Sequence, residues 1–332
     1  MMIRVGINGF GRIGRAVVRA LYESGYRDTI QVVAINDLAP VEISARLLQH
    51  DSIHGRFNQP VSWMDGHLQV GEDGMAYLSV ADPLQIPWGT HKADLVLECT
   101  GRFRDGEQAG QHIMGGAQKV LISSPAKEVD ATVVYGVNEA TLEPGHRVVS
   151  NASCTTNCLA PVLKVLHEQF GVEEGTVTTI HAMTNDQNLL DKAHKDIYRA
   201  RSAVSSMIPT RTGAAAAIGE VLPGLAGRLY GMSVRVPVTD VSLIDLVVRV
   251  GRETDAEEVN AALQNASARM PVLAYTEEPL VSVDFVHHPA SAIVDGRQTW
   301  ANGRLVKVMA WYDNEWGFSN RMLDVALTMM SL

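Results

Sequence analysis

The first 37 residues constrain the fold of this chain more than any other segment. An apolar run at residues 3–7 leads into a G-x-G-x-x-G motif, and apolar residues then recur with a helical period from 13 to 21. A second apolar run, 31–35, is followed by Asp37. The three glycines of the motif are Gly9, Gly11 and Gly14. A strand, this glycine turn, a helix, a second strand and an acidic residue together predict a βαβ unit that binds a dinucleotide.

Each part of this unit has a physical role in holding the dinucleotide. The glycines permit a tight turn and a close approach of the backbone, and the helix N-terminus faces the pyrophosphate. The Asp37 carboxylate can accept hydrogen bonds from an unmodified ribose and would repel a 2′-phosphate, which favours NAD over NADP. The alternative for Asp37 is a solvated residue at a strand end. The expected cofactor contacts are Gly9, Gly11, Arg12, Ile13, Gly14, Asp37 and, at the end of a later strand, Ser123.

The strand pattern changes near residue 150, which predicts two domains. Before it, runs such as 93–99 and 119–123 are continuously apolar, as in a parallel sheet that is covered on both faces. After it, longer alternating runs such as 176–184 and 242–250 indicate a mixed or antiparallel sheet. We therefore expect an α/β chain. It comprises a Rossmann-type, doubly wound NAD domain (1–150), an α+β catalytic domain (151–314) and a final helix (315–332) that packs back on the first domain. Further strands are expected at 133–137, 281–285 and 305–312.

The segment 150–158 places Cys154 among small polar residues, just before a helical pattern at 159–170. A helix N-terminus carries unpaired N–H groups and partial positive charge, so a cysteine there should lose its proton more easily and act as a nucleophile. The alternative is a buried structural cysteine, and the segment alone does not decide between them. Cys158 lies one helical turn further on, but two cysteines without further ligands do not make a metal site, and none is expected.

Composition narrows the class of protein. The 332 residues carry a net charge of −9, which argues against a nucleic-acid-binding surface as the main function. The chain opens directly on a strand pattern, with no secretion leader and no apolar run that could span a bilayer. Three cysteines make a disulfide framework improbable. We therefore expect a cytoplasmic protein with no nucleic-acid or membrane partner.

Three segments of the chain resemble those of a known family. They are residues 7–15 (INGFGRIGR), 150–158 (SNASCTTNC) and 311–318 (WYDNEWGF). On these motifs, in this order and over essentially the full length, the chain resembles the glyceraldehyde-3-phosphate dehydrogenase family, close to erythrose-4-phosphate dehydrogenase.

The resemblance implies a mechanism and a set of residues. Cys154 is expected to attack the substrate aldehyde, His181 to act as its base, and Asn314 to orient the nicotinamide. Hydride transfer to NAD would leave a thioester on Cys154, which inorganic phosphate breaks. The resemblance also implies a homotetramer. The residues matching the family's substrate and phosphate positions are Ser153, Thr155, Thr184, Arg199, Thr212, Gly213 and Arg235.

The choice of sugar phosphate depends on other segments. Residues 181–187 and 210–215 look like the glyceraldehyde enzyme, whereas 130–138 and 280–285 look like the erythrose enzyme. Because the first pair includes predicted phosphate contacts, we favour oxidation of glyceraldehyde 3-phosphate to 1,3-bisphosphoglycerate. The alternative is an erythrose-4-phosphate dehydrogenase that forms 4-phosphoerythronate for vitamin B6 synthesis. A protein of another class, which keeps the NAD fold without catalysis, would leave Cys154 no more reactive than an ordinary thiol.

Overall fold

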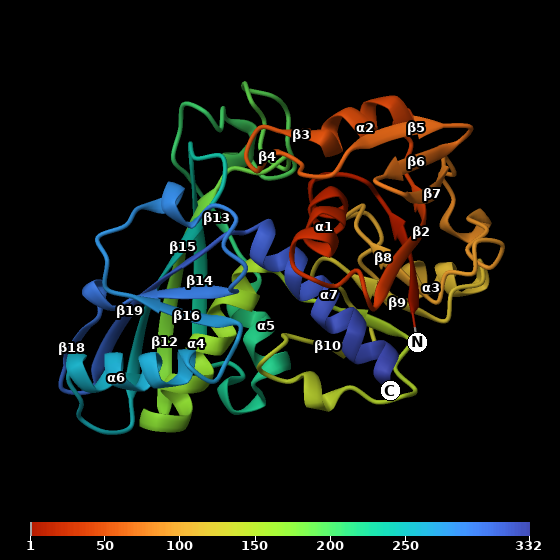
Figure 1. Ribbon diagram of the computed structural model, residues 1–332. Helices are drawn as coiled ribbons and strands as arrows, with labels where there is room; N and C mark the ends of the chain where they lie inside the picture. Colours follow the sequence, from red (N-terminus) through yellow and green to blue (C-terminus); the bar gives the residue numbers. More distant parts are fainter. Residues whose placement is uncertain (1) are drawn as a thin grey trace. The chain divides into compact units, whose positions relative to one another are not determined.

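The computed structural model describes residues 2–332, which form two compact units (Figure 1). Of the described residues, 2–135, 139–153 and 319–332 form the first unit, and 136–138 and 154–318 form the second. No helix within the described residues is long and apolar enough to cross a membrane.

A nine-stranded sheet, in the order β10-β11-β9-β8-β1-β2-β7-β6-β5, forms the centre of the first unit. The strands from β10 to β7 pair in parallel, and β5 and β6 add an antiparallel edge. The strands are β1 (Ile3–Asn8), β2 (Ile30–Asn36), β5 (Val61–Met64), β6 (His67–Val70), β7 (Asp73–Leu78), β8 (Leu95–Glu98), β9 (Lys119–Ile122), β10 (Ala131–Thr132) and β11 (Val148–Ser150), with a separate pair β3 (His50–Asp51) and β4 (Gly55–Arg56). Strand β2 is added on one side of β1 and strand β8 on the other, so the order of strands reverses between β1 and β8. Open α/β sheets bind their ligands at such a point.

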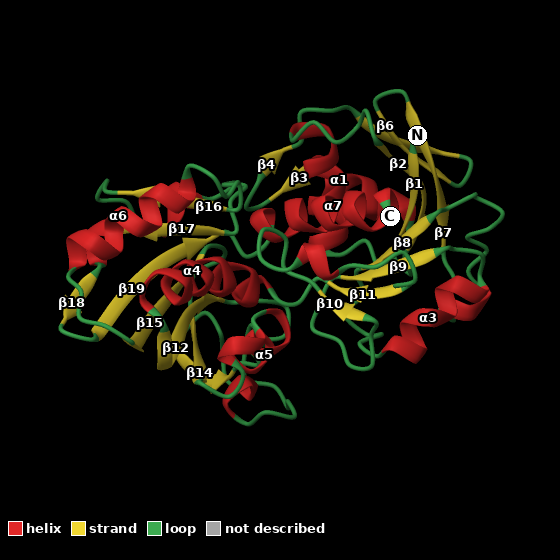
Figure 2. Ribbon diagram, turned by 90° about the horizontal axis from the view of Figure 1, so that it is seen from below, coloured by secondary structure: helices red, strands yellow, loops and turns green. Residues whose placement is uncertain are grey.

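Helices cover both faces of this sheet, as a doubly wound fold requires. Figure 2 shows α1 and α7 on one face and α3 on the other. The final helix is held to this unit by two hydrogen bonds: Tyr26 donates to Asp324 at 2.7 Å, and Lys119 donates to the carbonyl of Met329 at 2.6 Å. The helices are α1 (Arg12–Glu23), α2 (Val41–Gln49), α3 (Gly106–Met114) and α7 (Trp316–Ser331), with short 3-10 turns η1 (Pro83–Gln85) and η2 (Glu139–Thr141).

The second unit contains an eight-stranded mixed sheet, so the sheet types expected from the sequence are both present. Its main path is β13-β14-β12-β15-β19-β17-β16, and β18 pairs with β19. Helices α4, α5 and α6 lie on one face (Figure 2). The strands are β12 (Val172–Ala182), β13 (Ile208–Arg211), β14 (Leu229–Val236), β15 (Ser242–Val250), β16 (Leu273–Thr276), β17 (Ala292–Asp295), β18 (Trp300–Asn302) and β19 (Leu305–Tyr312). The helices are α4 (Cys154–Phe170), α5 (Ala214–Val221) and α6 (Ala256–Ser267), with turns η3 (Tyr198–Ala200), η4 (Pro223–Leu225), η5 (Ser282–Phe285) and η6 (Gly296–Gln298).

Two expected strands are wrong. Residues 282–285 form the 3-10 turn η5 with Val281 as its N-cap, and Asp284 accepts a 2.8 Å hydrogen bond from the Val281 N–H. The run 133–137 is also not a strand, since β10 ends at Thr132 and Gly136 turns the chain with a φ of 82°. In both places a local turn outcompetes the β preference of valine.

Candidate active site

Cys154 and His181, the two predicted catalytic residues, lie close together in the second unit. Cys154 is the first residue of α4, which begins five residues earlier than the apolar pattern suggests, and His181 lies near the end of β12. The Cys154 Sγ is 3.6 Å from His181 Nε2, within reach for proton transfer between a thiol and an imidazole. The hydroxyl of Tyr312 contacts those of Thr155 and Thr179 at 2.9 and 2.8 Å, so this side of the pair is tied to the sheet.

The surroundings of the pair favour its uncharged form. Burial, and next to it the positive charge of Arg235, lower the pKa of His181 to about 3, so the imidazole is neutral near pH 7. Burial also raises the pKa of Cys154, although the Arg235 charge and the backbone N–H groups at the start of α4 act in the opposite direction. The expectation that Cys154 would lose its proton more easily at a helix start is therefore wrong, because desolvation outweighs the effect of the helix N-terminus.

Arg235 controls which nitrogen of His181 carries the proton. Strands β12 and β14 run parallel with His181 beside Arg235, and the guanidinium Nη1 lies 2.6 Å from His181 Nδ1. The same Nδ1 is 2.7 Å from the carbonyl of Ala182. A neutral imidazole nitrogen either donates or accepts, so these contacts belong to different tautomers. When Nδ1 donates to Ala182, the Nε2 lone pair faces the sulfur and can act as a base; when Arg235 donates to Nδ1, Nε2 carries the proton.

The other predicted anion-binding residues lie in loops and at helix starts. Arg199 forms an ion pair with Asp186 and donates to Thr210 at 3.0 Å, yet its charge still lowers the pKa of His181. Gly213 is the N-cap of α5, preceded by Thr212, whose hydroxyl accepts from Ala214 at 3.2 Å. The backbone N–H groups at this helix start are suited to an anion.

Two further predicted residues are placed by their neighbours. Thr184 donates to the side chain of Gln187 at 3.1 Å. Ser153 immediately precedes Cys154 in the chain. Gln187 and Asp186 were not identified from the sequence, since loop residues of these types carry no distinctive pattern.

The glycine turn of the first unit has the shape that a dinucleotide requires. Gly9 has a φ of 91°, and a Cβ there would lie 2.6 Å from the backbone nitrogen of Thr100. A Cβ on Gly14 would lie 2.3 Å from the carbonyl oxygen of Gly9, so these two positions accept only glycine. Gly11, in contrast, has no atom within 4 Å of where its Cβ would be, which leaves its face open to a ligand. The turn therefore fits a pyrophosphate at the start of α1.

The remaining cofactor residues are positioned by short contacts within this unit. The Asp37 carboxylate accepts hydrogen bonds from the backbone N–H groups of Phe10 at 2.6 Å and Ala39 at 2.8 Å, which holds it beside the glycine turn with further lone pairs free for a ribose. The Arg12 side chain is paired with Asp51, and Arg12 is the first residue of α1, directly after the glycine turn. Ile13 follows in the first turn of α1, and Ser123 directly follows β9.

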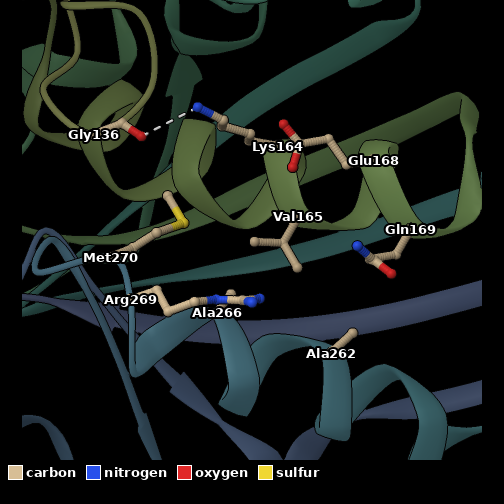
Figure 3. Close-up of a pocket in the computed structure, with 9 residues that line it drawn as sticks. All are labelled: Gly136, Lys164, Val165, Glu168, Gln169, Ala262, Ala266, Arg269 and Met270. Carbon is tan, nitrogen blue, oxygen red and sulfur yellow. Dashed lines mark hydrogen bonds between the residues drawn. The ribbon is translucent and has the colours of Figure 1, made fainter.

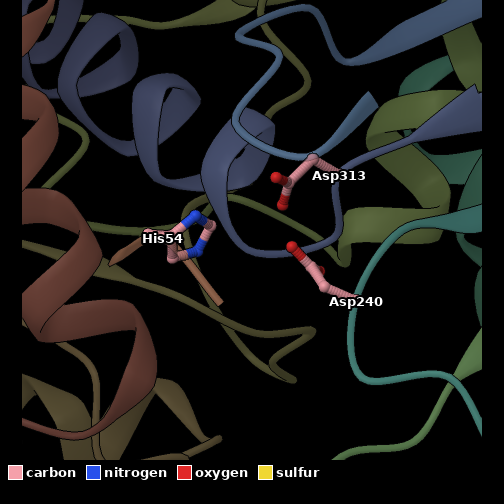
Figure 4. Close-up of side chains that lie close together, drawn as sticks. All are labelled: His54, Asp240 and Asp313. Carbon is pink, nitrogen blue, oxygen red and sulfur yellow. The ribbon is translucent and has the colours of Figure 1, made fainter. Parts of the chain in front are cut away.

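Asn314 lies between β19 and α7 in a buried polar turn, with its side-chain oxygen 2.7 Å from the hydroxyl of Ser242. The preceding Asp313 accepts hydrogen bonds from three backbone N–H groups, the closest being those of His287 and Trp316 at 2.7 Å. Figure 4 shows the carboxyl groups of Asp240 and Asp313 turned toward each other. Burial, followed by the charge of Asp313, raises the pKa of Asp240 to about 9, so Asp240 is protonated at neutral pH.

A cavity of about 280 Å³ between α4 and α6 lies apart from these groups (Figure 3). Lys164 and Arg269 line it, and Lys164 donates to the carbonyl of Val137 at 3.1 Å. None of the predicted catalytic or substrate residues lines this cavity, so it is not the candidate site.

Comparisons with known proteins agree on one family. Residues 3–106 match the profile of the glyceraldehyde 3-phosphate dehydrogenase NAD binding domain, and residues 153–314 match that of the glyceraldehyde 3-phosphate dehydrogenase C-terminal domain. The chain is 59% identical to a glyceraldehyde-3-phosphate dehydrogenase of Pseudomonas aeruginosa over 329 residues, 99% of this chain and 98% of the relative. It is 54% identical to the plasmid-encoded enzyme of Cupriavidus necator (99% of both chains) and 53% identical to that of Cereibacter sphaeroides (99% of both chains).

Proposed function

The chain belongs to the glyceraldehyde-3-phosphate dehydrogenase family, and on this basis we propose that it oxidises glyceraldehyde 3-phosphate to 1,3-bisphosphoglycerate, using NAD and inorganic phosphate. It is an NAD-dependent oxidoreductase that acts on an aldehyde. The observation that carries the proposal is the 3.6 Å contact between Cys154 Sγ and His181 Nε2 beside the Arg235 cation. The names of the relatives favour glyceraldehyde 3-phosphate over erythrose 4-phosphate.

Cys154 and His181 carry the covalent steps of the proposed reaction. As the Cys154 sulfur attacks the aldehyde carbon, the thiol proton passes to His181 Nε2 and from there to the carbonyl oxygen, so that a thiohemiacetal forms and His181 is neutral again. NAD, when bound, supplies the hydride acceptor for the oxidation of this thiohemiacetal. While hydride leaves the substrate carbon, neutral His181 accepts the hydroxyl proton of the thiohemiacetal, so a thioester remains on Cys154. Inorganic phosphate then attacks the thioester, releases the acyl phosphate and returns the sulfur as a thiol.

The anion-binding residues supply positive charge and N–H donors for the substrate phosphate and the attacking phosphate. We assign this role to Arg199, Arg235 and the start of α5 at Thr212 and Gly213, supported by the two cations beside His181 and by the exposed N–H groups of the helix. A phosphate that draws Arg235 away from His181 Nδ1 leaves that nitrogen free to donate to Ala182, and Nε2 then becomes the base. The hydroxyls assigned to substrate binding next to the nucleophile are those of Ser153, Thr155 and Thr184.

Two measurements test this function. NADH formation from glyceraldehyde 3-phosphate should require added phosphate or arsenate, and equal rates without either would contradict the thioester route. The specificity constant kcat/KM should be higher for glyceraldehyde 3-phosphate than for erythrose 4-phosphate, and the reverse order would assign the enzyme to the second sugar. As a matched control, Cys154→Ser should lose turnover and keep NAD affinity, whereas Cys158→Ser, one turn along the same helix, should retain turnover.

The exposed apolar side chains of the second unit support a homotetramer as the working form. In the loop 186–209, Leu189, Leu190, Ile197 and Met207 are each more than two-thirds exposed, and such groups are normally covered by a partner. Sedimentation should give about four times the chain mass of 36.0 kDa, and a monomer would contradict the assignment. We also assign the enzyme to the cytoplasm, because Cys154 must remain a free thiol and reducing compartments maintain one.

A further inference from the structure

We propose that Ser242 is a positioning residue that fixes the side-chain amide of Asn314 in one orientation, so that its NH₂ group faces the nicotinamide carboxamide. The proposal rests on the proposed function and, as the family resemblance implies, takes Asn314 as the residue that contacts this carboxamide. Ser242 itself touches neither substrate nor the reacting atoms in this assignment.

The sheet of the second unit brings three segments to the Ser242 hydroxyl. Ser242 opens β15 and pairs with Tyr312, the last residue of β19, two residues before Asn314. On its other side, the end of β12 supplies the backbone N–H of Ala182. Ser242 is 1% exposed and Asn314 is 7% exposed, so water does not replace these contacts freely.

The hydrogen bonds of this hydroxyl show how the amide lies, with Oδ1 facing Ser242. Ser242 Oγ accepts the Ala182 N–H at 3.0 Å and lies 2.7 Å from Asn314 Oδ1. A serine hydroxyl has a single proton, and Asn314 Oδ1 can only accept, so that proton is donated to Oδ1. The contact with Ser242 uses the Asn314 oxygen alone, which leaves the NH₂ group as the donor that can face the carboxamide.

This orientation matters because the two ends of an asparagine amide have almost the same shape and opposite hydrogen-bonding properties. With its NH₂ presented, Asn314 donates to the carbonyl oxygen of a carboxamide. With the amide turned over, it presents an oxygen, which can accept only from the carboxamide NH₂. Removing the Ser242 hydroxyl takes away the contact that distinguishes the two orientations.

A cofactor analogue separates these states without relying on turnover. 3-Acetylpyridine adenine dinucleotide keeps the carbonyl oxygen and replaces the NH₂ by a methyl group. Wild-type protein should therefore use the same Asn314 contact for both cofactors. In Ser242→Ala the amide can turn over and recover a contact with NAD but none with the analogue. Calorimetric titration should show the ratio of the two dissociation constants shifting against the analogue by about three- to tenfold, the equivalent of one hydrogen bond.

Ser242→Thr and Ser242→Val form the matched pair, since they have the same shape and only threonine keeps the hydroxyl. Threonine should restore the wild-type ratio, and valine should behave like alanine. An unchanged ratio in Ser242→Ala overturns the proposal, even if both affinities fall together through a structural effect. Because the readout is binding, a wild-type protein that fails to oxidise glyceraldehyde 3-phosphate would contradict the proposed function and leave this comparison intact.

Discussion

Replacing Arg235 by glutamine should raise the pKa of the Cys154 thiol. Among the interactions that lower this pKa, the charge of Arg235 is the largest, and only desolvation exceeds it in the opposite direction. Without this charge, less of the pKa increase caused by burial is offset, so the thiolate of Cys154 is harder to form. The pKa of His181 should rise as well, but from about 3, so the imidazole remains neutral where the thiol titrates and supplies no compensating charge.

The geometry sets the size of this effect. The guanidinium contacts one edge of the His181 ring at 2.6 Å, and the sulfur lies 3.6 Å from the other edge. The ring between them puts the cation within about 8 Å of the sulfur, where Coulomb's law with an effective dielectric of about 20 gives about 2 kcal/mol. One pKa unit corresponds to about 1.4 kcal/mol, so we expect an upward shift of about one to two units.

Alkylation of Cys154 by iodoacetamide, followed against pH by peptide mass spectrometry, measures this pKa. The reagent is neutral, so the loss of Arg235 does not change its attraction to the site. Arg201→Gln is the control, because Arg201 is an exposed arginine paired with Asp191 and should leave the profile unchanged. A pKa that is unaltered or lowered in Arg235→Gln would refute the electrostatic reasoning.

The other predictions concern the two carboxyl groups with the clearest surroundings. Asp240→Asn should stabilise the protein increasingly as pH rises from about 4 toward 9: a raised pKa means that the folded state binds the proton more tightly, so wild-type stability falls through this window, by up to about 1.4 kcal/mol per pH unit. Urea unfolding of both proteins at pH 5 and pH 8 tests this, and an equal difference at the two pH values would be inconsistent with a protonated Asp240. Asp37→Ser removes the carboxylate that would repel a 2′-phosphate and that accepts the Phe10 and Ala39 N–H groups, so the preference for NAD over NADP in kcat/KM should fall by about tenfold or more. A preserved preference would mean that another residue selects the cofactor, and Asp51→Ser, which removes the nearby partner of Arg12, is the comparison variant.

The elements that could be predicted from the sequence are those indicated by patterns within a few neighbouring residues. A glycine turn between an apolar strand and an amphipathic helix predicted β1, α1 and β2, because hydrophobic period and turn chemistry act over a few residues. The small polar segment around Cys154 likewise indicated that a helix follows, and α4 begins at Cys154 itself. The strand predicted at 281–285 is wrong, although valine favours β structure. Whether a strand forms also depends on a partner strand, which the local sequence does not reveal.

The arrangement of the candidate site follows from the tertiary structure and could not be predicted from the sequence. Arg235 stands 54 residues from His181 and Ser242 stands 72 residues from Asn314, and the register of the sheet brings each pair together. The protonation states of Cys154, His181 and Asp240 also depend on desolvation and on neighbouring charges, which no window of sequence contains. The sequence gives the types of the residues, whereas the burial of a side chain and its distance from a charge are set only when strands far apart in the sequence pair.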